Sequence, residues 1–121
     1  MPIIPWKLQA APKDDANGFM GTFRAGLQNL TPVDYRHKNG LAARTMVEEM
    51  LAVPKTAILI DRPPGTADTQ GIVVFRNEAP ILRILFLCVK PEGYRKGLGR
   101  QLLQAVQALG EKHGLGEVRV R

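Results

Sequence analysis

The chain has 121 residues, an apolar fraction of 45% and a formal net charge of +6. That length gives a single domain, residues 1–121, and the composition excludes disordered and fibrous classes. One cysteine, Cys88, excludes a disulfide framework and a thiolate metal cluster, and it fits a reducing, cytoplasmic setting. The longest apolar run, Ile84 to Val89, is too short to span a bilayer, and the start of the chain lacks a signal-peptide pattern, so we expect no membrane contact.

The first part of the chain predicts an edge strand and two helices. Ile3 to Leu8 forms the strand, and prolines at positions 2 and 5 confine it to an edge. A helix follows Asp14 and Asp15, with an apolar stripe of Phe19, Phe23 and Leu27, although three glycines weaken it. A second helix begins at Thr31 to Asp34, Asn39 and Gly40 can interrupt or restart it, and Pro54 ends it.

The pattern then changes to strands. Thr56 to Ile60 and Gly71 to Phe75 predict an antiparallel pair, and a turn leads into Ile81 to Val89. Because that last run is apolar throughout, we expect a central strand buried on both faces. An amphipathic helix with its stripe from Leu98 to Leu109 follows, and Glu117 to Arg121 starts a short strand.

Together these elements predict a mixed α+β fold in which helices flank a mostly antiparallel central sheet. The expected order is strand, two helices, three strands, helix, strand.

Most of the positive charge lies in the last third of the sequence. Residues 83–121 carry eight Lys or Arg against three Asp or Glu, which is a net +5. Such an excess favours a polyanionic partner, whereas the alternative is a solvated basic face. Nucleic acid is disfavoured as that partner, because aromatic residues are 6% of the chain and do not interleave with Lys or Arg.

The segment from Val89 to Arg100 joins the apolar strand to the amphipathic helix and contains the pair Gly97 and Gly99. A glycine turn at a helix start presents unpaired backbone N–H groups, and the helix dipole adds positive potential. Glycine lets phosphate oxygens reach that backbone, and nearby cations can add contacts: Arg95, Lys96 and Arg100. The alternative is a purely architectural tight turn. The lysine precedes the glycines and no Ser or Thr follows, so this is neither a Walker loop nor a dinucleotide fingerprint.

This segment resembles the coenzyme A loop of the GNAT (general-control-related N-acetyltransferase) superfamily. The resemblance rests on a valine, a proline, a Gly-x-Gly and a following Arg-x-Leu-Leu: Val89, Pro91, Gly97, Gly99, Arg100, Leu102 and Leu103. The motif matches cover about residues 81–121, and the rest of the chain matches in the order and type of its elements.

The resemblance implies that acyl-CoA, in particular acetyl-CoA, is the co-substrate. It places the pyrophosphate on the loop Tyr94, Arg95, Lys96, Gly97, Leu98, Gly99 and Arg100. It also implies that the backbone of Leu87 and Val89 pairs with the pantetheine arm, where the fourth and fifth strands of the family separate.

Three departures from the family pattern affect these expectations. The family places Gln or Arg three residues before the first glycine, and here that residue is Tyr94. Many members carry a glutamate base four residues before the valine, and here that position is Leu85. The sequence ends at Arg121, within the expected fifth strand, which suggests a minimal or truncated member, or one whose sheet is completed by a partner chain or a second copy.

Other candidate residues have plainer explanations. Cys88 sits within an apolar strand, so we expect a small buried side chain on the face opposite Leu87 and Val89. His37 and His113 lie in polar surroundings near helix ends, and their spacing with Cys88 fits no metal site. We therefore assign no catalytic residue and no metal.

Two hypotheses remain open. The first is an N-acyltransferase that moves an acetyl group from CoA to an amine, on a small molecule or a protein, by direct attack in a ternary complex. The second is a catalytically inactive GNAT-like binding or assembly module, which the leucine at position 85 and the free sheet edge favour.

Overall fold

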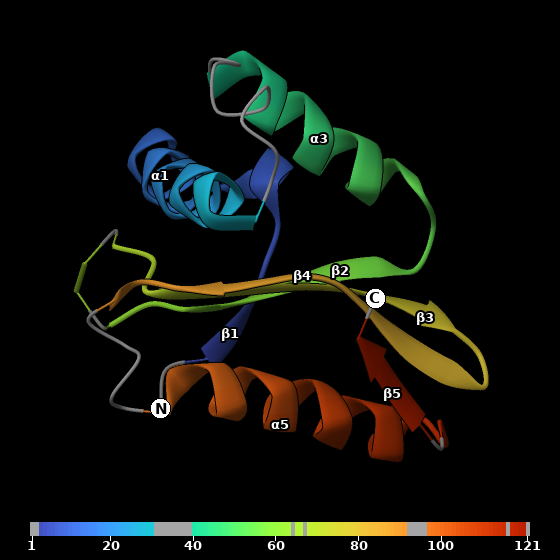
Figure 1. Cartoon of the computed structure of the whole chain (residues 1–121). Helices are drawn as coiled ribbons and strands as arrows, with labels where there is room; N and C mark the ends of the chain where they lie inside the picture. Colours follow the sequence, from blue (N-terminus) through green and yellow to red (C-terminus); the bar gives the residue numbers. More distant parts are fainter. Residues whose placement is uncertain are drawn as a thin grey trace.

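The computed structural model describes residues 3–30, 40–63, 65–66, 68–91, 97–115 and 117–120. They form three layers, in which two helices cover one face of a five-stranded sheet and a third helix covers the other (Figure 1). None of the described helices is long and apolar enough to cross a membrane.

The sheet follows the chain order β1-β2-β3-β4-β5. Its strands are β1 (Ile3–Trp6), β2 (Thr56–Asp61), β3 (Gly71–Glu78), β4 (Ile81–Val89) and β5 (Glu117–Val120). The first four pair antiparallel, and β5 runs parallel to β4. β1 lies at an edge, as its prolines predicted, since proline cannot donate a ladder hydrogen bond.

Three helices flank this sheet after a short 3-10 turn at Leu8–Ala10. α1 (Lys13–Leu30) and α3 (Gly40–Ala52) lie on one face, and α5 (Leu98–Lys112) lies on the other (Figure 1). The predicted mixed α+β fold and its order of elements are therefore confirmed. The predicted helix start at Thr31 to Asp34, and His37 after it, lie outside the described residues.

Each face of the sheet has its own apolar core. The core beneath α1 and α3 contains the predicted stripe Phe19, Phe23 and Leu27, and the tilted rings of Phe23 and Phe86 of β4 have centroids 4.4 Å apart. The core beneath α5 centres on Leu98, Leu102 and Val106, which are almost fully buried. Side chains that follow one another along a strand point to opposite faces of the sheet, and therefore to different cores. This alternation determines which residues of β4 face which helix.

The most buried strand is β3, whereas we had expected β4 to be central and buried on both faces. Gly71 to Phe75 of β3 are all buried, but β4 alternates between buried and half-buried residues. This buried part of β3 has a partner strand on both sides, whereas among the described residues β5 pairs only with Ile81 to Ile84 of β4.

β4 also contains a bulge. Phe75 pairs with Ile84 and Val74 pairs with Phe86, so Leu85 is an extra residue. Ile84 packs toward α5, but both Leu85 and Phe86 pack toward α1. An extra residue of this kind re-aims the side chains that follow it. Leu87 and Val89 consequently face α5, while Cys88 faces α1, as the sequence predicted.

Candidate functional site: a cleft between α1, the end of β4 and the start of α5

The start of α5 offers unpaired backbone N–H groups. Gly97 is the N-cap residue, with φ 67° and ψ 26°, and Gln101 N–H donates to Gly97 O at 3.1 Å as the first helical bond. The N–H groups of Leu98, Gly99 and Arg100 come before that first bond and so have no carbonyl partner within the helix. The first turn contains no acidic residue. This geometry favours an anion at the helix N-terminus.

The end of β4 presents its backbone on the open side of the sheet. Lys90 N–H donates to Gln70 O at 2.8 Å, next to the pair Gly71 and Val89. Because backbone groups alternate sides along an antiparallel strand, the N–H groups of Leu87 and Val89 point away from β3. They therefore face the side where β5 does not reach in the described part of the chain.

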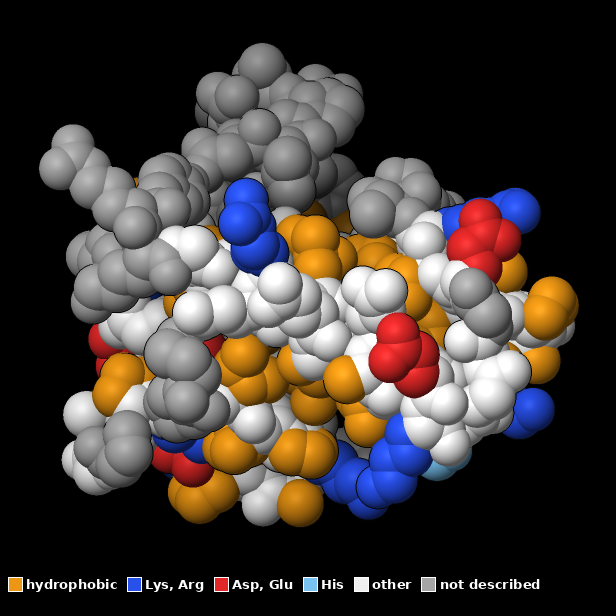
Figure 2. Space-filling view, turned by 90° about the horizontal axis from the view of Figure 1, so that it is seen from below, with side chains coloured by type: hydrophobic (Ala, Val, Ile, Leu, Met, Phe, Trp, Pro, Cys, Tyr) orange, Lys and Arg blue, Asp and Glu red, His pale blue; other side chains and the backbone are white. Residues whose placement is uncertain are grey.

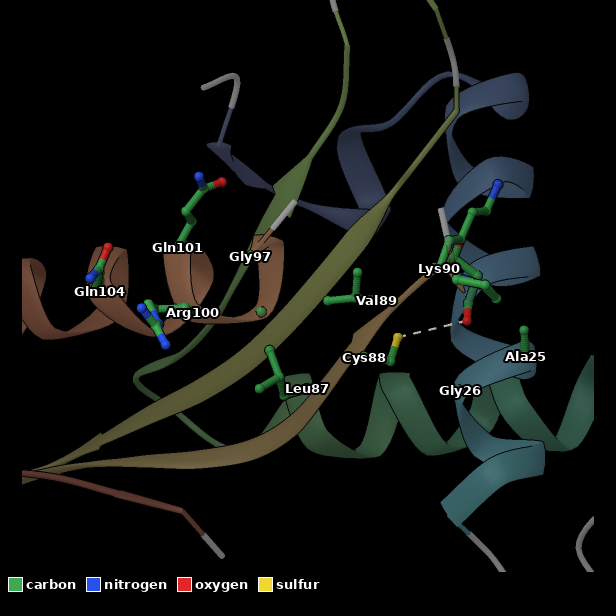
Figure 3. A pocket seen from close by; sticks show the side chains of 13 residues that line it. Ala25, Gly26, Leu87, Cys88, Val89, Lys90, Gly97, Arg100, Gln101 and Gln104 are labelled. Atoms are coloured by element: carbon green, nitrogen blue, oxygen red, sulfur yellow. Dashed lines mark hydrogen bonds between the residues drawn. The ribbon is translucent and has the colours of Figure 1, made fainter. Parts of the chain in front are cut away.

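These two features line one cleft of about 810 Å³, which is within the size range of ligand sites in proteins. Its walls come from three elements, namely α1, the end of β4 and the start of α5: Thr22, Ala25, Gly26, Leu87, Cys88, Val89, Lys90, Pro91, Gly97, Gly99, Arg100, Gln101 and Gln104. Figure 3 shows Arg100 and Gln104 at one end, Cys88, Ala25 and Gly26 at the other, and Val89 between them.

Arg100 is the cation best placed for an anionic ligand. Several other cations of the last third are paired: Arg83 with Glu78 at 2.7 Å, Lys90 with Asp68, and Arg119 with Glu117 at 3.0 Å. Arg100 is exposed on the cleft and has no carboxylate partner among the described residues.

On the face that carries α5, the described residues form no extended basic surface. In Figure 2 the lysine and arginine side chains of the described residues form separate groups, with apolar and acidic side chains between them. Among the described residues, Arg100 therefore provides a local positive charge at the cleft, which suits a compact anion better than a long polyanion.

On the opposite wall, the backbone of α1 at Gly26 packs directly on the side chains of Cys88 and Phe86 of β4. A Cβ on Gly26 would lie 2.6 Å from Cys88 Cβ, 2.9 Å from its Sγ and 3.0 Å from Phe86 Cζ. Thr22 Oγ1 donates to Thr69 O at 2.6 Å in a buried hydrogen bond, which anchors α1 to the loop before β3. From sequence Gly26 had suggested only a weakened helix, but its position is set by this close approach.

Cys88 is the single thiol in the cleft wall. Burial raises its pKa to about 12, because the thiolate loses its hydration there. Its Sγ lies 3.7 Å from the Thr22 carbonyl oxygen. At neutral pH it is a neutral, space-filling group and not a nucleophile.

The residues predicted to bind the cofactor fall into three groups. The structure brings Leu87, Val89, Gly97, Gly99 and Arg100 together around the cleft. The side chain of Leu98 is instead buried in the core beneath α5, so its contribution to the loop is its amide. The remaining three lie outside the described residues: Tyr94, Arg95 and Lys96.

Sequence reasoning missed the α1 wall and Gln101. Gln101 of α5 is half-buried in the cleft wall, and its Oε1 has no hydrogen-bond partner among the described residues. No periodic signal separates Thr22, Ala25 and Gly26 from other helix positions. The described residues contain no group of three metal-ligating side chains, and His113 is exposed at the end of α5.

Comparison with known proteins gave matches in structure alone. No protein-family model matches the chain, and no curated protein matches its sequence significantly. Ribosomal-protein-alanine N-acetyltransferase from Brucella melitensis biovar Abortus superposes with a TM-score of 0.72 at 18% identity, covering 98% of this chain and 77% of that one. AAC(6')-Iy, solved in complex with the bisubstrate analogue CoA-S-monomethyl-acetylneamine, gives 0.64 at 20% identity with the same coverage.

A third N-acetyltransferase structure also superposes on this chain. Aminoglycoside antibiotic 6'-N-acetyltransferase AAC(6')-IG from Acinetobacter haemolyticus gives a TM-score of 0.66 at 12% identity, over 100% of this chain and 79% of that one. The chain has the fold of the GNAT acetyltransferases. The likeness in fold covers 98% of this chain and 77% of each of the first two structures. The cleft borders the second half of β4, beside which no strand lies among the described residues.

Proposed function

We propose that residues 1–121 form one acyl-CoA-binding domain that transfers an acyl group, in particular acetyl, to an amine. The observation that carries the proposal is a single cleft that joins the unpaired amides at the start of α5 to the open backbone of β4. The GNAT fold supports the same reaction class, since the similar structures include N-acetyltransferases.

In this proposal the two ends of the cleft hold different parts of the co-substrate. The amides of Leu98, Gly99 and Arg100 and the Arg100 guanidinium hold the pyrophosphate, together with the rest of the loop, Tyr94 to Gly97. Leu87 and Val89 offer backbone groups to the pantetheine amides, as an added strand would receive them. The fit rests on donors aimed at the open side and on an exposed cation at the cleft.

The transfer step needs few groups from the protein. The amine nitrogen attacks the thioester carbonyl carbon, the C–N bond forms, the C–S bond breaks, and CoA leaves as its thiol after taking up the proton that the amine loses. Backbone N–H groups of β4 polarise the carbonyl, and positioning in the ternary complex supplies much of the rate.

A general base is absent from the described cleft wall. None of its residues is Asp, Glu or His, and Leu85 packs toward α1 where many family members carry glutamate. We therefore propose that the amine reacts in its neutral form and that water carries the proton. The acceptor is an amine of a small molecule or a protein.

The absence of a general base from the described cleft wall favours the second candidate, a GNAT-like module that binds CoA or a protein partner without catalysis. Leu85 is the specific residue behind it, because an apolar side chain cannot take a proton. A partner chain or a second copy would then use the sheet edge at β5, which is paired on its β4 side.

Release of free CoA thiol separates the two candidates. Purified protein is incubated with acetyl-CoA and a panel of amines: an aminoglycoside, a peptide with an N-terminal alanine, and a polyamine. Thiol release above the hydrolysis background, with acetylated amine found by mass spectrometry, supports the transferase. Binding of CoA without release for any amine supports the inactive module, and a chain that neither binds nor releases CoA contradicts both.

A further inference from the structure

The α1 end of the cleft is closed by direct helix-to-strand contact. Gly26 approaches Cys88 so closely that an added Cβ would lie 2.6 Å from Cys88 Cβ. A van der Waals contact between carbon atoms needs about 3.5 to 4.0 Å, so there is no space for another atom between α1 and β4 at this point.

Two further contacts hold α1 against the sheet at this end of the cleft. Phe86 packs on Phe23 of α1 with ring centroids 4.4 Å apart, and Thr22 is tied to the Thr69 carbonyl by a buried 2.6 Å hydrogen bond. Close-packed interiors yield little to an extra methylene group, because surrounding side chains must leave their rotamer minima. The wall therefore acts as a fixed stop.

The direction of the cleft determines which end of a bound ligand lies against Cys88 and Gly26. A ligand with phosphate at Gly97 and Arg100 that runs along Leu87 and Val89 points its other end at Cys88 and Gly26 (Figure 3). In acyl-CoA, the end opposite the pyrophosphate is the thioester and its acyl chain. The side chain at position 88, neutral and half-buried, is then a part of the surface that the acyl chain touches.

We propose that the contact between Gly26 and Cys88 limits the acyl group to a short chain, and that the volume of the Cys88 side chain sets the limit. This inference rests on the proposed function, and it adds the residues that set the length of the acyl chain, so that affinity falls from acetyl-CoA to propionyl-CoA and butyryl-CoA. Cys88 and Gly26 are specificity-determining residues of the cleft and take no part in the chemistry.

The test is a calorimetric titration of the full chain with free CoA, acetyl-CoA, propionyl-CoA and butyryl-CoA, which needs no acceptor. For the unaltered protein we expect affinity to fall with each carbon beyond acetyl. Cys88→Ala removes the sulfur and should raise the affinity ratio of propionyl-CoA to acetyl-CoA by about fourfold, the transfer effect of one buried methylene.

Val47→Ala is the matched control. Val47 is fully buried in the same core but does not line the cleft, so its truncation should leave the acyl ratio unchanged. Thermal unfolding of each variant shows that the fold is retained.

The outcomes separate the inference from the function beneath it. Equal affinity for the three acyl-CoAs, or an unchanged ratio in Cys88→Ala, overturns the inference while CoA binding stands. No binding of CoA in any form overturns the proposed function and the inference with it. A chain-length dependence that Cys88→Ala relaxes and Val47→Ala does not is the result that supports the proposal.

Discussion

Gly97 and Gly114 bracket α5 with the same backbone conformation. Their φ angles are +67° and +74°, and a Cβ built on either would meet nothing within 4 Å. They differ in place, since Gly97 lines the cleft and Gly114 follows the far end of the helix. The pair therefore separates the cost of the backbone conformation from the effect of a side chain in the cleft.

Substitution of either glycine by alanine should cost similar stability. A left-handed conformation costs a residue with a Cβ about 1 to 2 kcal/mol. We expect Gly97→Ala and Gly114→Ala to lower the free energy of unfolding by amounts that agree within about 0.5 kcal/mol, as measured by urea denaturation. A much larger loss at Gly97 would mean that its surroundings, and not φ alone, require glycine.

Gly26→Ala should destabilise the fold more than Gly97→Ala or Gly114→Ala. The added Cβ would lie 2.6 Å from Cys88 Cβ, and overpacking of this kind costs about 1 to 3 kcal/mol. Cys88→Ala removes the Sγ contact at 2.9 Å but leaves the Cβ contact at 2.6 Å, so it should rescue the variant less than Cys88→Gly, which removes both. Equal rescue by both, in denaturation of the double variants, would contradict the described contact.

Thr22→Val should weaken the link between α1 and the loop before β3. It removes the donor to Thr69 O and leaves a buried carbonyl unpaired, at a cost of about 1 to 3 kcal/mol. Thr22→Ser keeps the hydroxyl and serves as the control, so it should lose less. If the valine variant unfolds at the same urea concentration as the serine variant, the hydrogen bond contributes nothing.

Cys88 should make stability fall at alkaline pH. Burial raises its folded-state pKa from 9.0 to about 12, so the unfolded chain ionises first as pH rises. The contribution of the neutral thiol is complete below about pH 9 and is lost between pH 9 and 12. We expect the stability of the unaltered protein relative to Cys88→Ala to be constant from pH 7 to 8.5 and to decline above it.

The same shift gives a chemical readout. At pH 8 iodoacetamide should label Cys88 in the native protein far more slowly than in urea-unfolded protein, since the thiolate is the reactive species. Labelling at comparable rates in both states would show that the thiol is accessible and ionised in the fold.

Much of this fold could be predicted because apolar residues recur at different spacings in its helices and in its strands. The stripe Phe19, Phe23 and Leu27 and the stripe that begins at Leu98 and Leu102 are helical in spacing, and both are buried as expected. The positions of Leu87 and Val89 on the face opposite Cys88 follow from strand alternation alone, since no bulge lies between them.

The bulge at Leu85 could not be predicted. Ile81 to Val89 is apolar on both faces except at Arg83, so a slip of one residue leaves no trace in the hydrophobic pattern. No local pattern shows either that β5 pairs only with Ile81 to Ile84 among the described residues.

The site was predictable on one wall only. The glycines at 97 and 99 stand in a turn between a strand and a helix, which is a local signal. Gly26 and Thr22 take their roles from contacts with Cys88 and Thr69, which are 62 and 47 residues away in the sequence. Such long-range approaches depend on how α1 packs on the sheet, and no local pattern records them.

The central claim, that the start of α5 binds the pyrophosphate of acyl-CoA, is tested most directly by calorimetric titration of three proteins with acetyl-CoA at moderate salt. They are the unaltered chain, Gly97→Asn and Gly114→Asn, and asparagine is chosen because it tolerates positive φ. We predict micromolar binding that is retained by Gly114→Asn and weakened at least tenfold by Gly97→Asn. Equal affinity in all three proteins, or no binding by the unaltered chain, would contradict the claim.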